Sequence, residues 1–395
     1  MTLPVPVYVV GAARTPIGAF LGALSSLPAP RLGAAAIEAA LSRSKVPADR
    51  VGEVFMGNVL GAGIGQAPAR QAAIYANIPK SVPATTVGKV CGSGMQAVIL
   101  GAKSIALGDA EVVIAGGMES MSNVPYYMPQ ARGGYRMGHG QIIDGMIHDG
   151  LWDPYGNFHM GNAGELCAKK FEFSREAQDE FAKESFRRAV AAQKENLFDA
   201  EIVPVSVAQK KGDAIVVKQD EGPPAGKPDK IGTLKPAFQK DGTITAANAS
   251  SINDGASALI LAGEKAVKEL GLEPLARIVG YGGAAQEPDW FTTAPAYAID
   301  NTLGKLGMTK DQIDIWEINE AFAVVTMACN KICGLDPAKV NVRGGAVALG
   351  HPIGATGARM LTTMIYAMKD RGDKRGLATL CIGGGEALAV VLERP

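Results

Sequence analysis

The chain has no excess of charge of either sign. Its 395 residues contain 39 Lys plus Arg and 39 Asp plus Glu, so the formal net charge is zero and the sequence pI is about 6.9. Proteins that bind nucleic acid or anionic membranes through their overall field carry a clear positive excess. We therefore expect no nucleic acid and no membrane surface among its partners.

Long apolar runs are also missing. Hydrophobic residues make up 47% and charged residues 20%, as in ordinary soluble globular proteins, and no uninterrupted apolar run is long enough to span a bilayer. The N-terminus runs from Met1 directly into the apolar segment Val5 to Val10 without the features of a secretory signal. The last residues, Leu392 to Pro395, carry no peroxisomal tripeptide. We expect no membrane span and a cytoplasmic location.

Cysteine is scarce. The five cysteines, an odd number, are spread along the chain, which does not resemble a disulfide framework and favours a reducing compartment. Cys329 and Cys333 are four residues apart, but no nearby histidine or further cysteine completes a zinc set. We expect no catalytic metal.

Glycine is abundant, with 49 residues, and short apolar runs alternate with helical stretches of small residues. This pattern predicts a layered α/β protein. The strand-like runs 111–115 and 377–382 both end in glycines, and helix-like stretches precede them at 91–107 and 355–369. Two related halves are therefore predicted.

The region between the halves, about 122–251, is richer in Met, Tyr, His and charged residues and is interpreted as an inserted capping domain. Within it, Ser174 is expected to cap a charged helix over 175–196. The buried face of this helix is predicted to consist of Ala177, Phe181, Ala189, Val190 and Leu197. The proline-rich segment 220–228 is expected to be an exposed loop.

The first residue that could carry chemistry is Cys91. A strand-like approach turns through glycines into a helix at this point, and a helix N-terminus stabilises a thiolate against its usual pKa of about 8.5. From the motif alone, Cys91 is equally well interpreted as a nucleophile or as a buried structural cysteine.

Three further residues, His351, Cys381 and Asn319, could also carry chemistry. His351 lies among glycines and before Pro352, where it could act as an acid, a base or an oxyanion donor. Cys381 stands at a strand end before Gly383, whose backbone N–H is another candidate donor. Asn319 follows an apolar strand. Taken singly, each also fits a bland structural role, as a turn histidine, a core cysteine or a helix cap.

Taken together, these residues resemble the thiolase family, most closely its biosynthetic type. The matching segments occur in family order over nearly the whole chain; they are 90–95, 115–122, 319–323, 344–358 and 381–385. The resemblance implies a five-layered α-β-α-β-α fold of two similar halves plus an inserted loop domain. It places the N-terminal half at 1–121, completed by about 252–273, the loop domain at 122–251 and the C-terminal half at 274–395.

The resemblance also implies an acetyl-CoA C-acetyltransferase. Cys91 would take an acetyl group from acetyl-CoA, and Cys381 would remove the α-proton of a second acetyl-CoA. His351 and a water held by Asn319 would stabilise the enolate oxygen, and the N–H groups of Cys91 and Gly383 would bind the thioester oxygen.

Other residues are implied in binding the acyl-pantetheine part of the substrate. The matching positions are Leu151, His159, Met160, Ser250, Ala321 and Phe322. Two positions depart from the family pattern, because Arg343 stands where asparagine is frequent and Glu386 stands where methionine is common. The contacts to the CoA nucleotide are not assigned.

The implied partners are acetyl-CoA, acetoacetyl-CoA and CoA, which are substrates and products, so no separate cofactor is expected. The resemblance also implies a homo-oligomer, because members of the family form dimers or tetramers, and a tetramer is favoured over a dimer. A broader-range 3-ketoacyl-CoA thiolase stays open as an alternative, because pocket depth is not visible in a sequence. A ketoacyl synthase pairs its cysteine with two histidines, which disfavours it here. An inactive acyl-CoA- or lipid-binding relative should have lost Cys91, His351 or Cys381, and this chain keeps all three.

Overall fold

The computed structural model describes residues 3–395. Its main sheet has the strand order β14-β15-β16-β13-β1-β12-β5-β3-β4. The elements of the N-terminal half are β1 (Val7–Arg14), α1 (Ala29–Ser44), β3 (Glu53–Gly57), α2 (Pro68–Tyr75), β4 (Ala84–Val87), α3 (Ser93–Leu107), β5 (Val112–Ser120), β12 (Asn253–Gly263) and α7 (Glu264–Leu270).

The C-terminal half repeats this arrangement. Its elements are β13 (Ala276–Ala285), α8 (Ala294–Leu306), β14 (Ile315–Ile318), α9 (Ala323–Cys333), α10 (Ala346–Leu349), α11 (Ile353–Arg371), β15 (Arg375–Ile382) and β16 (Glu386–Glu393). In each half a parallel pair, β3–β5 or β14–β15, continues into antiparallel neighbours, β12 and β1 or β16 and β13. The predicted duplication is confirmed.

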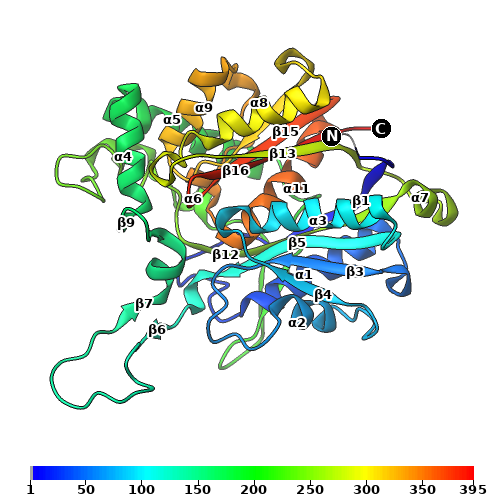
Figure 1. The fold of residues 1–395 in the computed structure, drawn as a ribbon, viewed down its shortest axis with the longest axis horizontal. Helices are drawn as coiled ribbons and strands as arrows, with labels where there is room; N and C mark the ends of the chain where they lie inside the picture. Colours follow the sequence, from blue (N-terminus) through cyan, green and yellow to red (C-terminus); the bar gives the residue numbers. More distant parts are fainter. Residues whose placement is uncertain (1–2) are drawn as a thin grey trace.

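The helices form layers around these strands. α1 and α2 cover the outer face of the N-terminal strands, α8 covers β13, β15 and β16, and α3 packs against α11 between the two sets of strands (Figure 1). A short pairing of β1 with β13 joins the two sets into one sheet. This is the predicted five-layered α-β-α-β-α arrangement, and it brings the ends of α3, α11, β5 and β15 close together.

One helical stretch, Val90–Leu107, is long and apolar enough to cross a membrane by length and composition alone. It consists of a short turn and α3, which packs against β3, β5 and α11, and 61% of it is buried. Its apolar character is explained by this interior position between two sheets.

The inserted region lies beside the layers and includes a projecting hairpin (Figure 1). Its elements are β6 (Tyr126–Tyr127), β7 (Ile143–Asp144), β8 (Trp152–Asp153), β9 (Phe158–His159), α4 (Met160–Phe171), α5 (Arg175–Lys194), β10 (Val205–Val207), β11 (Ile215–Val217) and α6 (Gly222–Ala225). β2 (Gly18–Ala19), from the N-terminal half, pairs with β12.

The charged helix α5 has the predicted cap, because the Ser174 side chain accepts from the N–H of Ala177. Its predicted buried face is wrong except for Ala189. The buried residues are Gln178, Asp179, Ala182, Ser185, Ala189 and Ala192. Polar side chains can be buried there because they have hydrogen-bond partners on other segments. Asn248 donates to Asp179, and Ser185 donates to Glu320.

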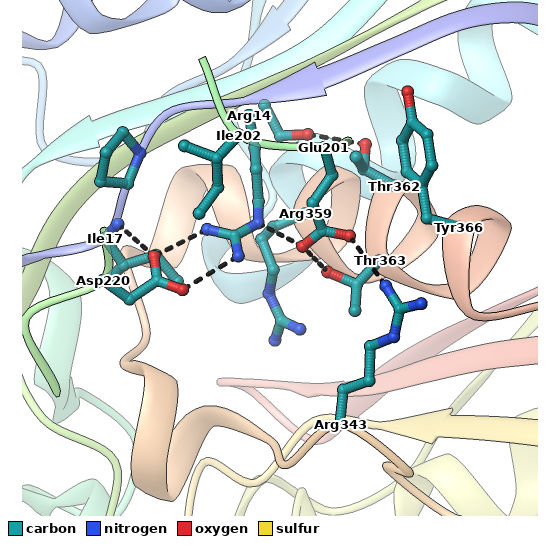
Figure 2. A network of polar contacts seen from close by, with 12 residues as sticks. Arg14, Ile17, Glu201, Ile202, Asp220, Arg343, Arg359, Thr362, Thr363 and Tyr366 are labelled. Carbon is teal, nitrogen blue, oxygen red and sulfur yellow. Dashed lines mark hydrogen bonds and ion pairs between the residues drawn. The ribbon is translucent and has the colours of Figure 1, made fainter. Parts of the chain in front are cut away.

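The segment 220–228 is only in part the exposed loop that its prolines predicted, because Pro224, Ala225, Lys227 and Pro228 are exposed but the other residues are not. Gly222–Ala225 forms one helical turn with proline in its first positions, where no N–H donor is needed. Asp220 is buried and pairs with both terminal nitrogens of Arg14, at 2.7 and 2.9 Å, while Glu201 accepts from Arg14 Nε at 2.6 Å (Figure 2). The inserted region is therefore tied to the end of β1 by a buried charge cluster.

Candidate active site

A cavity of about 200 Å³ lies where the ends of α3, α11 and β15 meet the inserted region. Its lining residues come from segments far apart in the sequence. They are Val90, Cys91, Met121, Gly150, Leu151, His159, Met160, Phe238, Ala249, Ser250, Ser251, Ile252, Phe291, Ala321, Phe322, His351, Ile353 and Gly383.

Cys91 lies in the single turn that leads into α3. The preceding Val90 adopts a left-handed conformation with φ of 44°, which is strained for a β-branched residue. The Ser93 hydroxyl braces the turn, because it accepts from the N–H of Lys89 and donates to the carbonyl of Val90. The chain thus presents the Cys91 side chain to the cavity, as its place before a helix predicted.

The thiol of Cys91 is not the acidic group that the helix N-terminus predicted. Desolvation raises the pKa of Cys91 to about 11, although part of the side chain faces the cavity. The backbone N–H groups of Gly383 and of Cys91 itself act in the opposite direction, since both face the sulfur, and the charge of Glu119 adds to the rise. Burial outweighs the helix terminus here. In the free protein Cys91 is therefore a thiol at neutral pH.

His351 lines the same cavity from the turn before α11. Its Nδ1 lies 2.7 Å from the Thr356 hydroxyl, and its backbone N–H donates to Asn253 Oδ1 at 2.9 Å. Burial, and then the charge of Arg359, lower the pKa of His351 to about 3. The imidazole is neutral at physiological pH, so Nε2 can accept a proton or donate one, depending on the tautomer.

Two of the predicted residues, Asn319 and Cys381, are not among the residues that line the cavity. Asn319 Nδ2 is 3.5 Å from His351 Nε2, and Asn319 Oδ1 is buried without a hydrogen-bond partner. An unpartnered oxygen beside the cavity suits the predicted water. Desolvation, and then the nearby Cys91, raise the pKa of Cys381 well above its usual value. The two cysteines are therefore close enough for their charges to interact.

Each residue that the resemblance assigned to substrate binding lines this cavity: Leu151, His159, Met160, Ser250, Ala321 and Phe322. The His159 ring stacks on Phe238, with centroids 4.8 Å apart, and the Phe238 ring meets Phe322 edge-on at 5.9 Å. Burial lowers the pKa of His159. A stacked, neutral imidazole suits an uncharged acyl or pantetheine group.

Sequence reasoning missed several apolar lining residues. They are Val90, Met121, Phe238, Ile252, Phe291 and Ile353. Phe238 and Phe291 occur in segments without a matching motif, and both pack on Phe322. No local pattern distinguishes such residues from core residues; only the folded chain brings them to the cavity.

Comparison with known proteins agrees with this geometry. The family models "Thiolase, N-terminal domain" and "Thiolase, C-terminal domain" match residues 7–265 and 272–394. The chain belongs to the thiolase family. It is 55% identical to acetyl-CoA acetyltransferase 2 of Arabidopsis thaliana over 99% of this chain and 97% of the relative. The acetyl-CoA acetyltransferase of Schizosaccharomyces pombe is 50% identical over 98% of each chain.

A solved structure supports the same assignment of this thiolase. The Acat5 thiolase from Ascaris suum, crystallised in complex with coenzyme A, superposes with a TM-score of 0.94 and 46% sequence identity. The match covers 99% of this chain and 100% of that one. The fold predicted from the motifs is therefore confirmed over its whole length.

The two departures from the family pattern both have partners. Arg343 points away from the cavity, because it donates to the Leu197 carbonyl at 2.8 Å and pairs with Asp370. Figure 2 shows it beside the buried Glu201. Glu386, at the start of β16, forms an ion pair with Lys89, two residues before Cys91. This pair connects the turn that carries Cys91 to the glycine loop that carries Gly383.

We expect Glu386→Gln to slow acyl transfer only slightly. The two side chains are 27% and 41% exposed, and such pairs contribute about 0–1 kcal/mol, so the rate should fall by less than about fivefold. Steady-state rates at low and high salt measure this, and the difference between variant and parent should shrink as salt screens the pair. A loss much larger than fivefold would mean that Glu386 contacts the substrate instead.

Proposed function

We propose that this thiolase is an acetyl-CoA C-acetyltransferase. It condenses two acetyl-CoA molecules to acetoacetyl-CoA and CoA, and it catalyses the reverse thiolysis. One observation carries the proposal: the sulfur of Cys91 faces the N–H groups of Cys91 and Gly383 inside the cavity that His351 also lines. A nucleophile, paired oxyanion donors and a neutral imidazole are the parts that acyl transfer needs.

The first half of the reaction transfers an acetyl group to the enzyme. The Cys91 thiol loses its proton to the neutral imidazole of His351, and the sulfur attacks the carbonyl carbon of acetyl-CoA. The bond from this carbon to the CoA sulfur breaks, the departing thiolate takes up the proton, and CoA leaves. The N–H groups of Cys91 and Gly383 stabilise the negative oxygen while it forms.

The second half forms the carbon–carbon bond. The Cys381 thiol first gives its proton to Nε2 of His351. The resulting thiolate removes a proton from the methyl carbon of a second acetyl-CoA, and the enolate carbon attacks the acetyl group on Cys91. The carbon–sulfur bond to Cys91 breaks, the Cys91 sulfur takes the proton back from His351, and acetoacetyl-CoA is released. The enolate oxygen is assigned to His351 Nε2–H and to a water on Asn319, whose unpartnered Oδ1 supports this role.

The cavity favours short acyl groups. The rings of Phe238, Phe291 and Phe322 pack together along its wall, which leaves about 200 Å³ beside Cys91. This favours the acetyl-specific reaction over the broader 3-ketoacyl-CoA thiolase. The substrates and products are CoA thioesters and CoA, and no separate cofactor is required.

A homotetramer in the cytoplasm is part of the proposal. The hairpin around β6 and β7 projects from the body of the molecule (Figure 1) and exposes large apolar side chains. They are Tyr126, Met128, Met137 and Ile142, with exposed fractions from 52% to 98%. Apolar surface on a projecting arm is typical of a contact between subunits. Sedimentation of the purified protein tests the oligomeric state.

Mass spectrometry after brief exposure to acetyl-CoA tests the reaction. We expect one acetyl group per chain, located on the peptide that contains Cys91, and parallel-line initial-rate kinetics for thiolysis of acetoacetyl-CoA. If neither acetylation nor thiolysis occurs with acetyl or longer substrates, the proposal is wrong. The chain would then be an acyl-CoA- or lipid-binding protein that keeps the catalytic residues.

A further inference from the structure

Glu119 is a fully buried carboxyl group close to the active site, and the reaction proposed above does not use it. It lies near the end of β5, which is buried along its whole length. It belongs to the glycine-rich segment 115–122, which matches the family but received no role from the sequence. Its proximity to the nucleophile is shown by its charge, which contributes to the raised pKa of Cys91.

Both oxygens of Glu119 are surrounded by donors. Oε1 accepts from Asn58 Nδ2 at 2.7 Å and from the N–H of Leu60 at 3.1 Å. Oε2 accepts from the N–H groups of Val59 at 3.1 Å and Gly354 at 2.9 Å. A proton on either oxygen would face an N–H group instead of an acceptor. The geometry therefore fits the carboxylate and not the neutral acid.

The contact with Gly354 reaches the turn that carries His351. Gly354 lies in the first turn of α11, three residues after His351. Its carbonyl oxygen fills a slot that exists only because Gly57, Gly94 and Gly117 have no side chains, since a Cβ at any of them would lie within 2.9 Å of it. Within this tight backbone packing, the carboxylate of Glu119 accepts the hydrogen bond from the N–H of Gly354.

The contacts with Val59 and Leu60 reach the other side of the cavity. Leu60 packs with Met121 and Ile353, and Cys91 and Leu151 pack against the same apolar cluster. One carboxylate therefore holds both the loop after β3, next to Cys91, and the start of α11, next to His351.

We propose that Glu119 is a positioning residue for the reaction at Cys91 and His351, and that only its ionised form holds the His351 turn in place. This rests on the proposed function. Burial raises the pKa of Glu119 to about 7, against the pull of the N–H donors and with a small contribution from the charge of Asp254. The titratable groups that face it are Asp254 on β12 and Cys91. Protonation as the pH falls through about 7 removes an acceptor and loosens the turn, so activity should fall on the acid side.

The two reacting groups Cys91 and His351 do not explain such an acid limb. The pKa of His351 is lowered to about 3, and the pKa of Cys91 is raised to about 11, so neither titrates between pH 6 and 8. Glu317 and Glu320 are rivals, because burial raises both pKa values, that of Glu317 to about 8. Glu317 pairs at 3.8 Å with Arg359, and Glu320 accepts from Ser185, Asn341 and the N–H of Val347. Asn58 donates to Glu119 and to neither rival, so a change at Asn58 separates Glu119 from both.

The test is the pH profile of acetoacetyl-CoA thiolysis from pH 5 to 9 in three variants. In Asn58→Ala, Glu119 loses one donor, and the acid midpoint should rise by about 0.5 unit or more. In Glu119→Gln, kcat should fall about 10- to 100-fold and the acid limb should flatten. In Asn301→Ala, which removes an exposed contact to the Gly283 carbonyl, the profile should match that of the parent.

A midpoint that is unchanged in Asn58→Ala would overturn the proposal, even if Glu119→Gln does not fold. Acetylation of Cys91, measured by mass in each variant, separates this failure from a failure of the proposed function. If the parent acquires the acetyl group and catalyses thiolysis while the midpoint stays fixed, only the role of Glu119 is wrong.

Discussion

Cys91→Ala is expected to abolish both acetylation of the protein and thiolysis of acetoacetyl-CoA. Without the sulfur no acyl-enzyme can form, and the oxyanion donors at Cys91 and Gly383 have no tetrahedral intermediate to stabilise. The loss of kcat should exceed about 10⁴-fold, as for other covalent nucleophiles. Stopped-flow release of CoA and intact-protein mass measure the two effects separately.

Cys329→Ala is the matched control for this variant. Cys329 is fully buried in α9, within the apolar cluster between α8, α9 and the C-terminal strands, and does not line the cavity. Its removal should lower stability without changing turnover of the folded protein. Full activity in Cys91→Ala would contradict the mechanism and move the nucleophile to another residue.

The positions of the proposed catalytic residues could be predicted because their motifs are local. Each of these residues lies at a strand end or beside a helix start, where glycines leave a recognisable spacing, and the fold brings these ends together. Cys91, His351 and Gly383 line one cavity, with Asn319 3.5 Å from the imidazole. The two related halves could be predicted for the same reason, because each shows a local pattern of a helix followed by a strand that ends in glycines.

The protonation state of Cys91 could not be predicted from its motif. A helix start favours the thiolate, but the balance depends on how many groups desolvate the sulfur, and this is known only in the folded chain. The prediction had the wrong sign, since the pKa is raised to about 11. In the proposed mechanism Cys91 therefore loses its proton to a base as it reacts, and the neutral His351 is assigned that role.

Buried polar contacts were also invisible in the sequence. The apolar periodicity of α5 predicted the wrong face, because Asp179 and Ser185 are buried against hydrogen-bond partners from distant segments. Asp220 is buried for the same reason, although the prolines after it indicated a loop. Hydrophobic pattern alone cannot identify a polar group whose partner lies about 70 to 200 residues away.

Cys381→Ala should divide the reaction into its two halves. Cys91 would still take the acetyl group, because its oxyanion donors are intact, but no base would remove the α-proton of the second acetyl-CoA. Loss of a general base lowers turnover about 10²- to 10⁴-fold. Mixing the variant with acetyl-CoA should release one equivalent of CoA per chain and then nearly stop, with the acetyl group retained on Cys91.

The size of this burst distinguishes a base from a structural cysteine. Cys381 is 1% exposed and packs with Phe322 and Phe291, so a purely structural role would reduce the burst and the turnover together through loss of fold. A full burst with little turnover can arise only if the residue acts after acetylation. Cys381→Ser should behave like the alanine variant, because a hydroxyl is too weakly acidic to provide the base at neutral pH, whereas normal turnover in either variant would assign proton removal to another group.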